Sequence, residues 1–427
     1  MQKLFTILAF GFATATIAQT GYGELDNWIF STGNCTYETY VGPPGGTTNT
    51  VNMTDAGDVL EICYDANNVY VRTNNLPGTY TAGPWTNPNV PIAQNYIFKI
   101  PRNPTPASGA HTAQPFGGPM AVSTNGISIY GFGDAKSYSS SANNNINGGD
   151  GLWNSDAWVS EGSTMDPTGN GHCDGTGSYH YHANPAALYN DPSSFHSPLI
   201  GFALDGYPIY GPFGYSSAMD NSSSITRMTS GYALRSITDR TVLPGGTSSI
   251  PPGPSDFSTF PLGTYWEDYD FTGTGTLDIY NGRDCVTPEY PTGTYAYFLA
   301  TDGAGDPAFP YFIGSEYYGD VNGADIGPSA TTWTVPGGTT CITQYTTSVG
   351  EILLEDVSMF PNPVNAQLTI DAGTSTVVSV LIYDTFGRLI LSFNNTSQID
   401  VSELSNGLYS VSIQTETGYA IKNLIKN

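Results

Sequence analysis

The segment Ser178-Tyr179-His180-Tyr181-His182 constrains the local fold more than any other part of this 427-residue chain. Its phenol and imidazole side chains alternate with a period of two, which is the period of an extended strand. In a strand, His180 and His182 share one face, and Tyr179 and Tyr181 share the opposite face. Two imidazoles on one strand supply two preset nitrogen donors, so this pattern is typical of a metal clamp.

Histidine is rare in this chain, and its distribution is uneven. Four of the five histidines lie between residues 172 and 196, which favours a common site. The candidate metal ligands are His172, His180, His182 and His196. The carboxylates and phenols that would complete or surround the site are Asp174, Asp205, Glu289, Tyr179 and Tyr181. Imidazole ligands suit zinc or copper, so a transition metal of this kind is the expected cofactor.

Two interpretations of the strand histidines stay open. Three imidazoles with a bound water would leave a metal position open for chemistry, whereas four protein ligands would close the site and make it structural. Alternatively, His180 and His182 hydrogen-bond to carboxylates and serve only the fold. The fifth histidine, His111, lies in the distant segment Gly109–Thr112 and is expected at the surface.

The composition favours short strands joined by ordered turns over helices. The chain contains 50 Gly, 30 Pro and 29 Tyr, and only 11% of its residues are charged. Gly and Pro mark turns and interrupt helices, whereas Tyr favours strands. We therefore expect a mainly β protein, long enough to divide into two or three units.

The net charge argues against one class of partner. Acidic residues number 37 and basic residues 12, which gives a formal charge of −25, and Lys and Arg form no cluster. Nucleic acid is therefore not an expected partner. The acidic excess suits a solvated, exported protein.

The N-terminus has the pattern of a secretory signal peptide over residues 1–18. Lys3 precedes the apolar run Leu4–Phe10, and small residues extend to Ala18. Cleavage after Ala18 would make Gln19 the first residue of the mature chain. No later stretch is long and apolar enough to form a transmembrane anchor, so we expect a location outside the cytoplasm.

The five cysteines suit disulfides in an oxidising compartment, and their odd number leaves at least one unpaired. We favour a bond between Cys35 and Cys63, because both lie in the β-rich N-terminal stretch. Cys173, which adjoins a candidate ligand, is either a thiolate ligand or a disulfide partner. The sequence leaves open the pairing among Cys173, Cys285 and Cys341.

The residue pattern of the sequence changes near residue 346. Residues 19–345 contain strands punctuated by Gly, Pro and Tyr, and residues 346–356 have the character of a linker. Over residues 357–427, apolar and polar side chains alternate, as in Tyr409–Ile413, and turn signals separate the runs. We expect a small, Ig-like antiparallel β-sandwich in this last segment.

The last segment carries four separated motifs: Phe360–Pro363, Ile382–Arg388, Asn406–Tyr409, and an end bearing Lys422 and Lys426. With these motifs it resembles the type A C-terminal sorting domain of the type IX secretion system. The resemblance implies handling by the type IX machinery and passage across an outer membrane. It further implies removal of this domain, followed by release or attachment at the cell surface.

The larger unit resembles the YHYH domain family over roughly residues 70 to 320. The resemblance begins near Val71, and the motifs that carry it, in chain order, are Ala93–Tyr96, Asn125–Ile127, Gly177–His182, Leu204–Pro212, Glu267–Tyr269, Leu277–Asp278, Asn281–Arg283, Thr287–Pro291 and Gly293–Tyr297. The resemblance implies a large β-rich domain. It implies no particular biochemical activity, so the function has to be argued from the residues.

Two classes of function stay open. The first is a secreted or cell-surface metal-site protein, with catalytic turnover undecided and no catalytic residue assigned. The second is a non-catalytic surface binding or adhesive module for a glycan or protein ligand, because Tyr and Trp are good platforms for sugar rings. We favour the first class because of the His-x-His pattern. The metal, the substrate or ligand, and the final attachment of the protein are left open.

Overall fold

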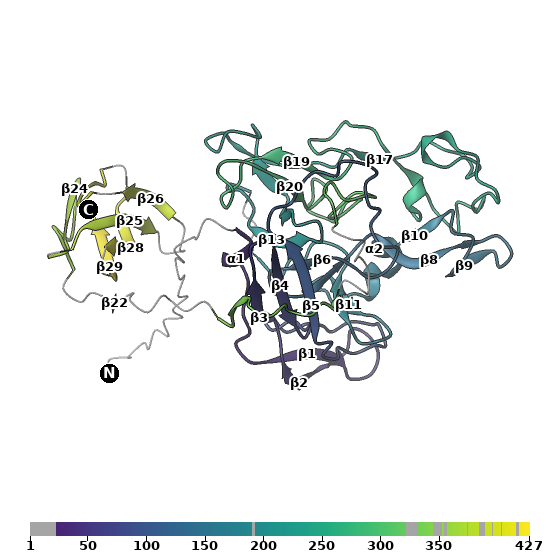
Figure 1. Cartoon of the computed structure of the whole chain (residues 1–427), viewed down its shortest axis with the longest axis horizontal. Helices are drawn as coiled ribbons and strands as arrows, with labels where there is room; N and C mark the ends of the chain where they lie inside the picture. Colours follow the sequence, from purple (N-terminus) through teal and green to yellow (C-terminus); the bar gives the residue numbers. More distant parts are fainter. Residues whose placement is uncertain are drawn as a thin grey trace, which may run out of the picture. The chain divides into compact units, whose positions relative to one another are not determined.

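Figure 1 presents the computed structural model of the chain, which describes residues 23–189, 193–321, 331–344, 352–353, 357–373, 375–383, 389–394, 396–402, 404–415 and 418–427. These residues form two compact units, one up to Gln344 and one after it. Strands dominate both units, which confirms the predicted mainly β class. The expected signal peptide, and all of the expected linker except Ile352–Leu353, lie outside the described residues.

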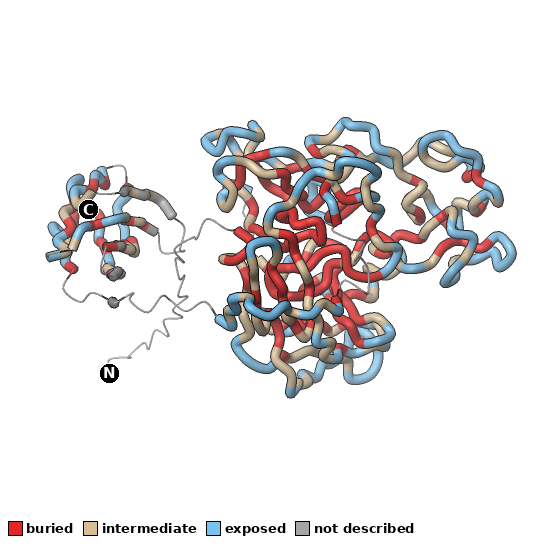
Figure 2. Tube along the Cα trace, viewed as in Figure 1, coloured by how far each residue is buried: buried red, intermediate tan, exposed pale blue. Residues whose placement is uncertain are grey.

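An eight-stranded sheet forms the centre of the first unit, in the order β11-β12-β7-β6-β13-β14-β20-β19. Its strands are β6 (Pro119–Ser123), β7 (Ser128–Tyr130), β11 (Gly171–Cys173), β12 (Tyr179–Tyr181), β13 (Leu199–Ala203), β14 (Pro208–Tyr210), β19 (Gly282–Cys285) and β20 (Thr294–Phe298). Every residue of β6, β12 and β13 is buried, because both faces of the sheet are covered. Figure 2 shows this burial as a continuous core through the unit.

A second sheet of the first unit has the order β21-β3-β4-β5. Its strands are β3 (Val59–Tyr64), β4 (Asn68–Thr73), β5 (Tyr96–Pro101) and β21 (Thr340–Ile342). A disulfide joins Cys63 on β3 to Cys341, its register partner on β21. The expected bond between Cys35 and Cys63 is therefore wrong. Cys35, Cys173 and Cys285 are buried free thiols.

Shorter sheets extend the first unit. They are β1 (Asn34–Tyr40) with β2 (Thr48–Ala56), β15 (Phe213–Tyr215) with β16 (Ile225–Arg227), β17 (Tyr232–Leu234) with β18 (Tyr269–Phe271), and β8 (Gly133–Ser139) between β9 (Asn144–Asn147) and β10 (Asn154–Asp156). The helices are short: α1 (Gly23–Asp26), α2 (Ala157–Glu161) and the 3₁₀ turns Gly162–Thr164, Pro244–Gly246 and Trp266–Asp268. No helix of the described residues has the length and apolar character that a bilayer span requires.

The second unit contains two antiparallel sheets and a short parallel pairing. One sheet has the order β22-β29-β28-β25-β26 and the other β23-β24-β27. The strands are β22 (Ile352–Leu353), β23 (Ser358–Phe360), β24 (Gln367–Asp371), β25 (Val377–Tyr383), β26 (Leu389–Asn394), β27 (Gln398–Asp400), β28 (Gly407–Thr415) and β29 (Gly418–Lys426). Leu368, Ile399 and Val411 contribute to one shared core from both sheets. This arrangement is consistent with the predicted Ig-like sandwich.

The Cys63–Cys341 bond gives a testable prediction for the first unit. It closes a loop of 278 residues, so replacing Cys341 with Ser should lower the free energy of unfolding of this unit by about 3 to 5 kcal/mol. Denaturant titration of the variant against a Cys35→Ser control would measure the loss. Peptide mapping without reduction should recover a Cys63–Cys341 peptide, and a Cys35–Cys63 peptide in its place would contradict the assignment.

Candidate metal centre

A tight β-hairpin brings the first two candidate ligands together. Strands β11 and β12 pair antiparallel, and His172 lies directly opposite His180. The turn between them is stabilised by Asp174, whose Oδ1 accepts hydrogen bonds from the backbone N–H groups of Thr176 (2.8 Å) and Ser178 (3.1 Å). Asp174, proposed from the sequence as a carboxylate of the site, therefore uses this oxygen to hold the turn, as Asp commonly does.

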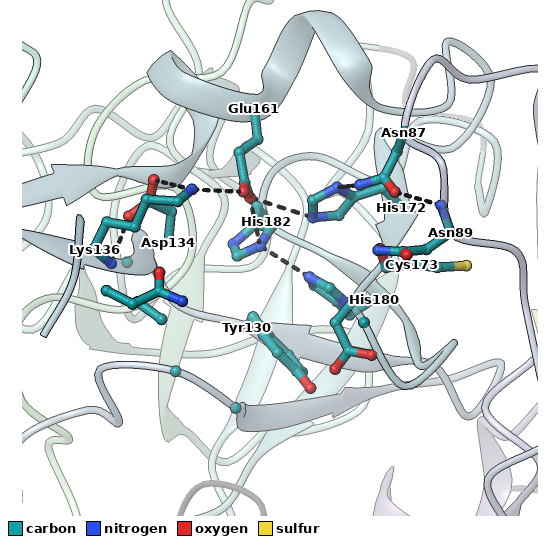
Figure 3. A pocket seen from close by; sticks show the side chains of 17 residues that line it. Asn87, Asn89, Tyr130, Asp134, Lys136, Glu161, His172, Cys173, His180 and His182 are labelled. Carbon is teal, nitrogen blue, oxygen red and sulfur yellow. Dashed lines mark hydrogen bonds and ion pairs between the residues drawn. The ribbon is translucent and has the colours of Figure 1, made fainter. Parts of the chain in front are cut away.

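The two faces of β12 have different surroundings, as the period of two predicts. His180 lies on β12 and His182 directly follows its last residue, and their imidazoles lie together on one side (Figure 3); we call these two residues the strand histidines. Tyr179 and Tyr181 enter a separate phenol network in which their hydroxyls lie 3.0 and 3.1 Å from the hydroxyl of Tyr80. The Tyr179 hydroxyl also donates to Asp166 at 2.8 Å. These two tyrosines therefore make their hydrogen bonds on the side of the strand opposite the imidazoles.

The Nδ1 atoms of the strand histidines contact backbone carbonyl oxygens. His180 Nδ1 lies 3.0 Å from the carbonyl oxygen of Ser178, and His182 Nδ1 lies 2.8 Å from that of Gly131. A carbonyl only accepts, so each Nδ1 carries the proton and each neutral ring presents a lone pair at Nε2. Such second contacts are the usual means of orienting a metal-binding histidine. The two Nε2 atoms are 3.0 Å apart.

Two further side chains reach the same point. His172, His180 and His182 each present one nitrogen within 4.8 Å of the others. Glu161, the last residue of α2, places Oε2 3.4 Å from His172 Nε2 and 3.9 Å from His182 Nε2. The other Glu161 oxygen lies 3.5 Å from Lys136 Nζ. Sequence analysis missed Glu161, because a single acid before a Gly-Ser turn carries no motif, and only the fold brings α2 to the hairpin.

Burial determines the charge state of this cluster. The three histidine residues are 2 to 3% exposed. Burial lowers the pKa of His172 to about 3 and that of His182 to about 4, and it lowers the pKa of His180 well below its usual value. Burial also raises the pKa of Glu161, which the nearby Lys136 ammonium opposes. The rings are therefore neutral near pH 7, the state in which imidazole binds metals.

The cluster lies at the wall of an open cleft of about 640 Å³. Figure 3 shows the three imidazoles and Glu161 directed toward one another beside Lys136 and Asp134. Tyr130 stacks on the His180 ring at 3.9 Å between ring centres and fixes its orientation. The three histidines and Glu161 line this cleft, so a solute in it lies next to the cluster.

The other predicted site residues lie elsewhere in the first unit. His196 is not in the three-histidine group; its Nδ1 contacts the carbonyl of Ser197, and its ring packs against Tyr210 and Phe298. Asp205 accepts hydrogen bonds from the Tyr297 hydroxyl and the backbone N–H groups of Tyr207 and Gly319.

Glu289 and His111 also contact residues outside the cluster. Glu289 accepts a hydrogen bond from the Tyr210 hydroxyl at 2.8 Å. His111, expected at the surface, is half-buried, with its ring stacked on Tyr280 and its Nδ1 2.7 Å from the Tyr317 carbonyl. Sequence proximity to the YHYH motif therefore did not determine which donors converge.

The neutral, buried imidazoles predict an acid-sensitive fold. The pKa of His182 is about 4 in the folded state, whereas an unfolded histidine has a pKa of about 6.5. Its stabilising contribution is present above about pH 6.5 and is lost as the pH falls toward 4, by about 3 kcal/mol. Urea denaturation with a chelator present, at about pH 7.5 and pH 4, should therefore show a smaller acid loss of unfolding free energy in His182→Asn than in the wild type.

Comparison of these two proteins cancels the shared groups that do not interact with His182. His182 also lowers the pKa values of His172 and His180, so its removal reduces the acid loss further in the same direction. Asp156, whose pKa burial raises to about 7, favours the folded state at low pH and opposes the histidine effect in both proteins. Equal acid losses in variant and wild type would contradict the prediction.

The comparisons with known families agree with both resemblances. Residues 97–308, which include all three clustered histidines and Glu161, match the family described as YHYH protein. Residues 358–427 match the family described as secretion system C-terminal sorting domain. No curated protein matches the chain. The chain therefore contains a YHYH family region, followed by a secretion-system C-terminal sorting domain.

Proposed function

We propose that the protein is an exported metal-site protein that binds one transition-metal ion, zinc or copper, in the cleft beside β12. His180 and His182 supply the first two ligands through Nε2, and His172 and Glu161 complete the surroundings of the ion. The observation that carries the proposal is the 3.0 Å approach of two Nε2 atoms whose Nδ1 atoms both contact carbonyl oxygens.

This approach is unfavourable without a cation. Two neutral rings with protonated Nδ1 atoms direct lone pairs at each other, and burial keeps water from compensating for the repulsion. Protonation of one Nε2 is also disfavoured, because burial lowers both pKa values. A metal ion bound by both nitrogens turns the repulsion into coordination, and imidazole suits zinc and copper.

Glu161 and the cleft favour a site that exchanges ligands with solvent. The carboxylate adds a negative charge beside the ion, which offsets part of the cost of bringing the cation into a partly buried position. The cleft leaves one side of the cluster open, which is typical of a reactive site. The molecule that binds at this open side decides whether the ion catalyses a reaction or only binds a ligand.

Metal analysis of the full exported chain tests this proposal. After dialysis, elemental mass spectrometry should find about one equivalent of zinc or copper, because the donors are preset by second contacts. A variant carrying His180→Asn and His182→Asn should lose the metal. His196→Asn is the matched control, because His196 is a half-buried histidine of the same unit outside the cluster.

The two variants separate the metal site from general loss of structure. Retention of metal by the control and its absence from the double variant support the proposal, provided that circular dichroism shows both folded. A folded wild-type protein that takes up neither zinc nor copper overturns the metal-site proposal. That outcome supports the non-catalytic surface binding module instead.

For the route of export, we propose a cleaved signal peptide at residues 1–18 and removal of the sorting domain during passage through the type IX machinery. The match to a sorting domain over residues 358–427 supports this route. In a host with that machinery, deletion of residues 357–427 should keep the protein from the surface and the medium, as fractionation would measure. A mature N-terminus at Gln19 is expected, and unaltered export of the deletion variant would contradict the proposal.

A further inference from the structure

His172 is held differently from the two strand histidines, and the difference originates in the loop that contains Asn87. The Asn87 Oδ1 accepts a hydrogen bond from the backbone N–H of Asn89 at 2.8 Å. A backbone N–H can only donate, so the Asn87 atom that faces it must be the oxygen. The amide nitrogen Nδ2 therefore faces His172, 3.1 Å from its Nδ1.

The loop that positions Asn87 is itself well anchored. The Trp85 indole N–H donates to the carbonyl of Asn89 at 3.0 Å, and the Asn89 side chain donates to the carbonyl of Cys173 at 3.2 Å. The second contact joins the loop to β11, next to His172. Rotation of the Asn87 amide would place its NH₂ group against the Asn89 N–H, so the observed orientation is strongly preferred.

This orientation fixes the tautomer of His172. The Asn87 Nδ2 donates to Nδ1, so the neutral ring carries its proton at Nε2. Nε2 is buried and has no hydrogen-bond partner; Glu161 Oε2 is 3.4 Å away but lies outside hydrogen-bond geometry. His172 therefore directs an unsatisfied N–H donor toward the cluster, whereas His180 and His182 direct lone pairs.

We propose that His172 donates a hydrogen bond from Nε2 to an oxygen ligand of the metal, and that the ion itself is held by His180, His182 and Glu161. Asn87 is the positioning residue that keeps His172 in this role. The inference rests on the proposed metal site and assigns its ligand class: a small oxygen ligand such as hydroxide or a carboxylate group. Two imidazoles and one carboxylate leave positions open for it.

The charges in the cleft agree with these roles. Lys136 lies beside one oxygen of Glu161 and beside Asp134, so the other oxygen, Oε2, is the one directed at the imidazoles. An oxygen ligand on the metal would satisfy the His172 Nε2–H, a buried donor without a hydrogen-bond partner. The same ligand would enter from the open side of the cleft.

Electron paramagnetic resonance of the full chain loaded with Cu(II) tests the assignment, because the spectrum counts coordinated nitrogens. The wild type should show two imidazole nitrogens on the copper. The variant Asn87→Asp should show three, since its carboxylate still accepts a hydrogen bond from the Asn89 N–H but now also accepts one from a protonated His172 Nδ1. That change moves the lone pair of His172 to Nε2 and lets it coordinate.

Acetate serves as the probe for the oxygen ligand. Replacing His172 with Phe should leave one equivalent of copper bound but weaken acetate binding to the copper by about tenfold or more, because a hydrogen bond to a charged acceptor is lost. Acetate titration followed by the copper spectrum would measure this. Unchanged acetate affinity in His172→Phe overturns the donor role.

The outcomes distinguish this inference from the proposal on which it rests. Three imidazole nitrogens on the copper of the wild type would overturn the role of His172 and leave the metal site intact. A folded wild type that takes up no copper or zinc overturns both. The wild-type nitrogen count decides the question even where a variant fails to fold.

Discussion

Burial of β12 on both faces is the constraint on which the rest of the site depends. The strand lies between β11 and β7 in the central sheet, and all three of its residues are buried. Polar side chains placed there must find partners or destabilise the fold. The phenols do so through Tyr80 and Asp166, and the imidazoles do so through backbone carbonyls. The same requirement therefore organises both faces of the strand.

The carbonyl contacts give one nitrogen of each imidazole a partner, but they leave the other nitrogen without a donor. They satisfy Nδ1 of His180 and His182, but they leave two Nε2 lone pairs 3.0 Å apart in a poorly solvated position. A fold that only needed these histidines as hydrogen-bond donors would not have to bring their second nitrogens together. The competing interpretation, in which the pair hydrogen-bonds to carboxylates and serves the fold alone, does not account for that approach. The metal proposal does.

Long-range contacts decide the composition of the site. Glu161 comes from α2 and Asn87 from a loop before β5, and neither has a sequence signal that separates it from the many other polar residues of this chain. His196, by contrast, is only 14 residues after His182, yet it packs against Tyr210 and Phe298 outside the cluster. The disulfide illustrates the same point, because Cys341 reaches β3 through strand pairing across 278 residues.

The sequence by itself determined the strand class, the shared face of His180 and His182, the resemblance to the two families, and the alternation that builds the C-terminal sheets. These features follow from local backbone periodicity and from motifs, and both can be recognised in the amino-acid sequence itself. Only the tertiary structure decided that Glu161 joins the cluster, that His196 does not, and which cysteine bonds to Cys63. The tautomer of His172 belongs to the same group, because it depends on one amide brought from 85 residues away. Such contacts depend on how sheets and loops pack, and packing joins residues whose separation along the chain carries no information about their distance in space.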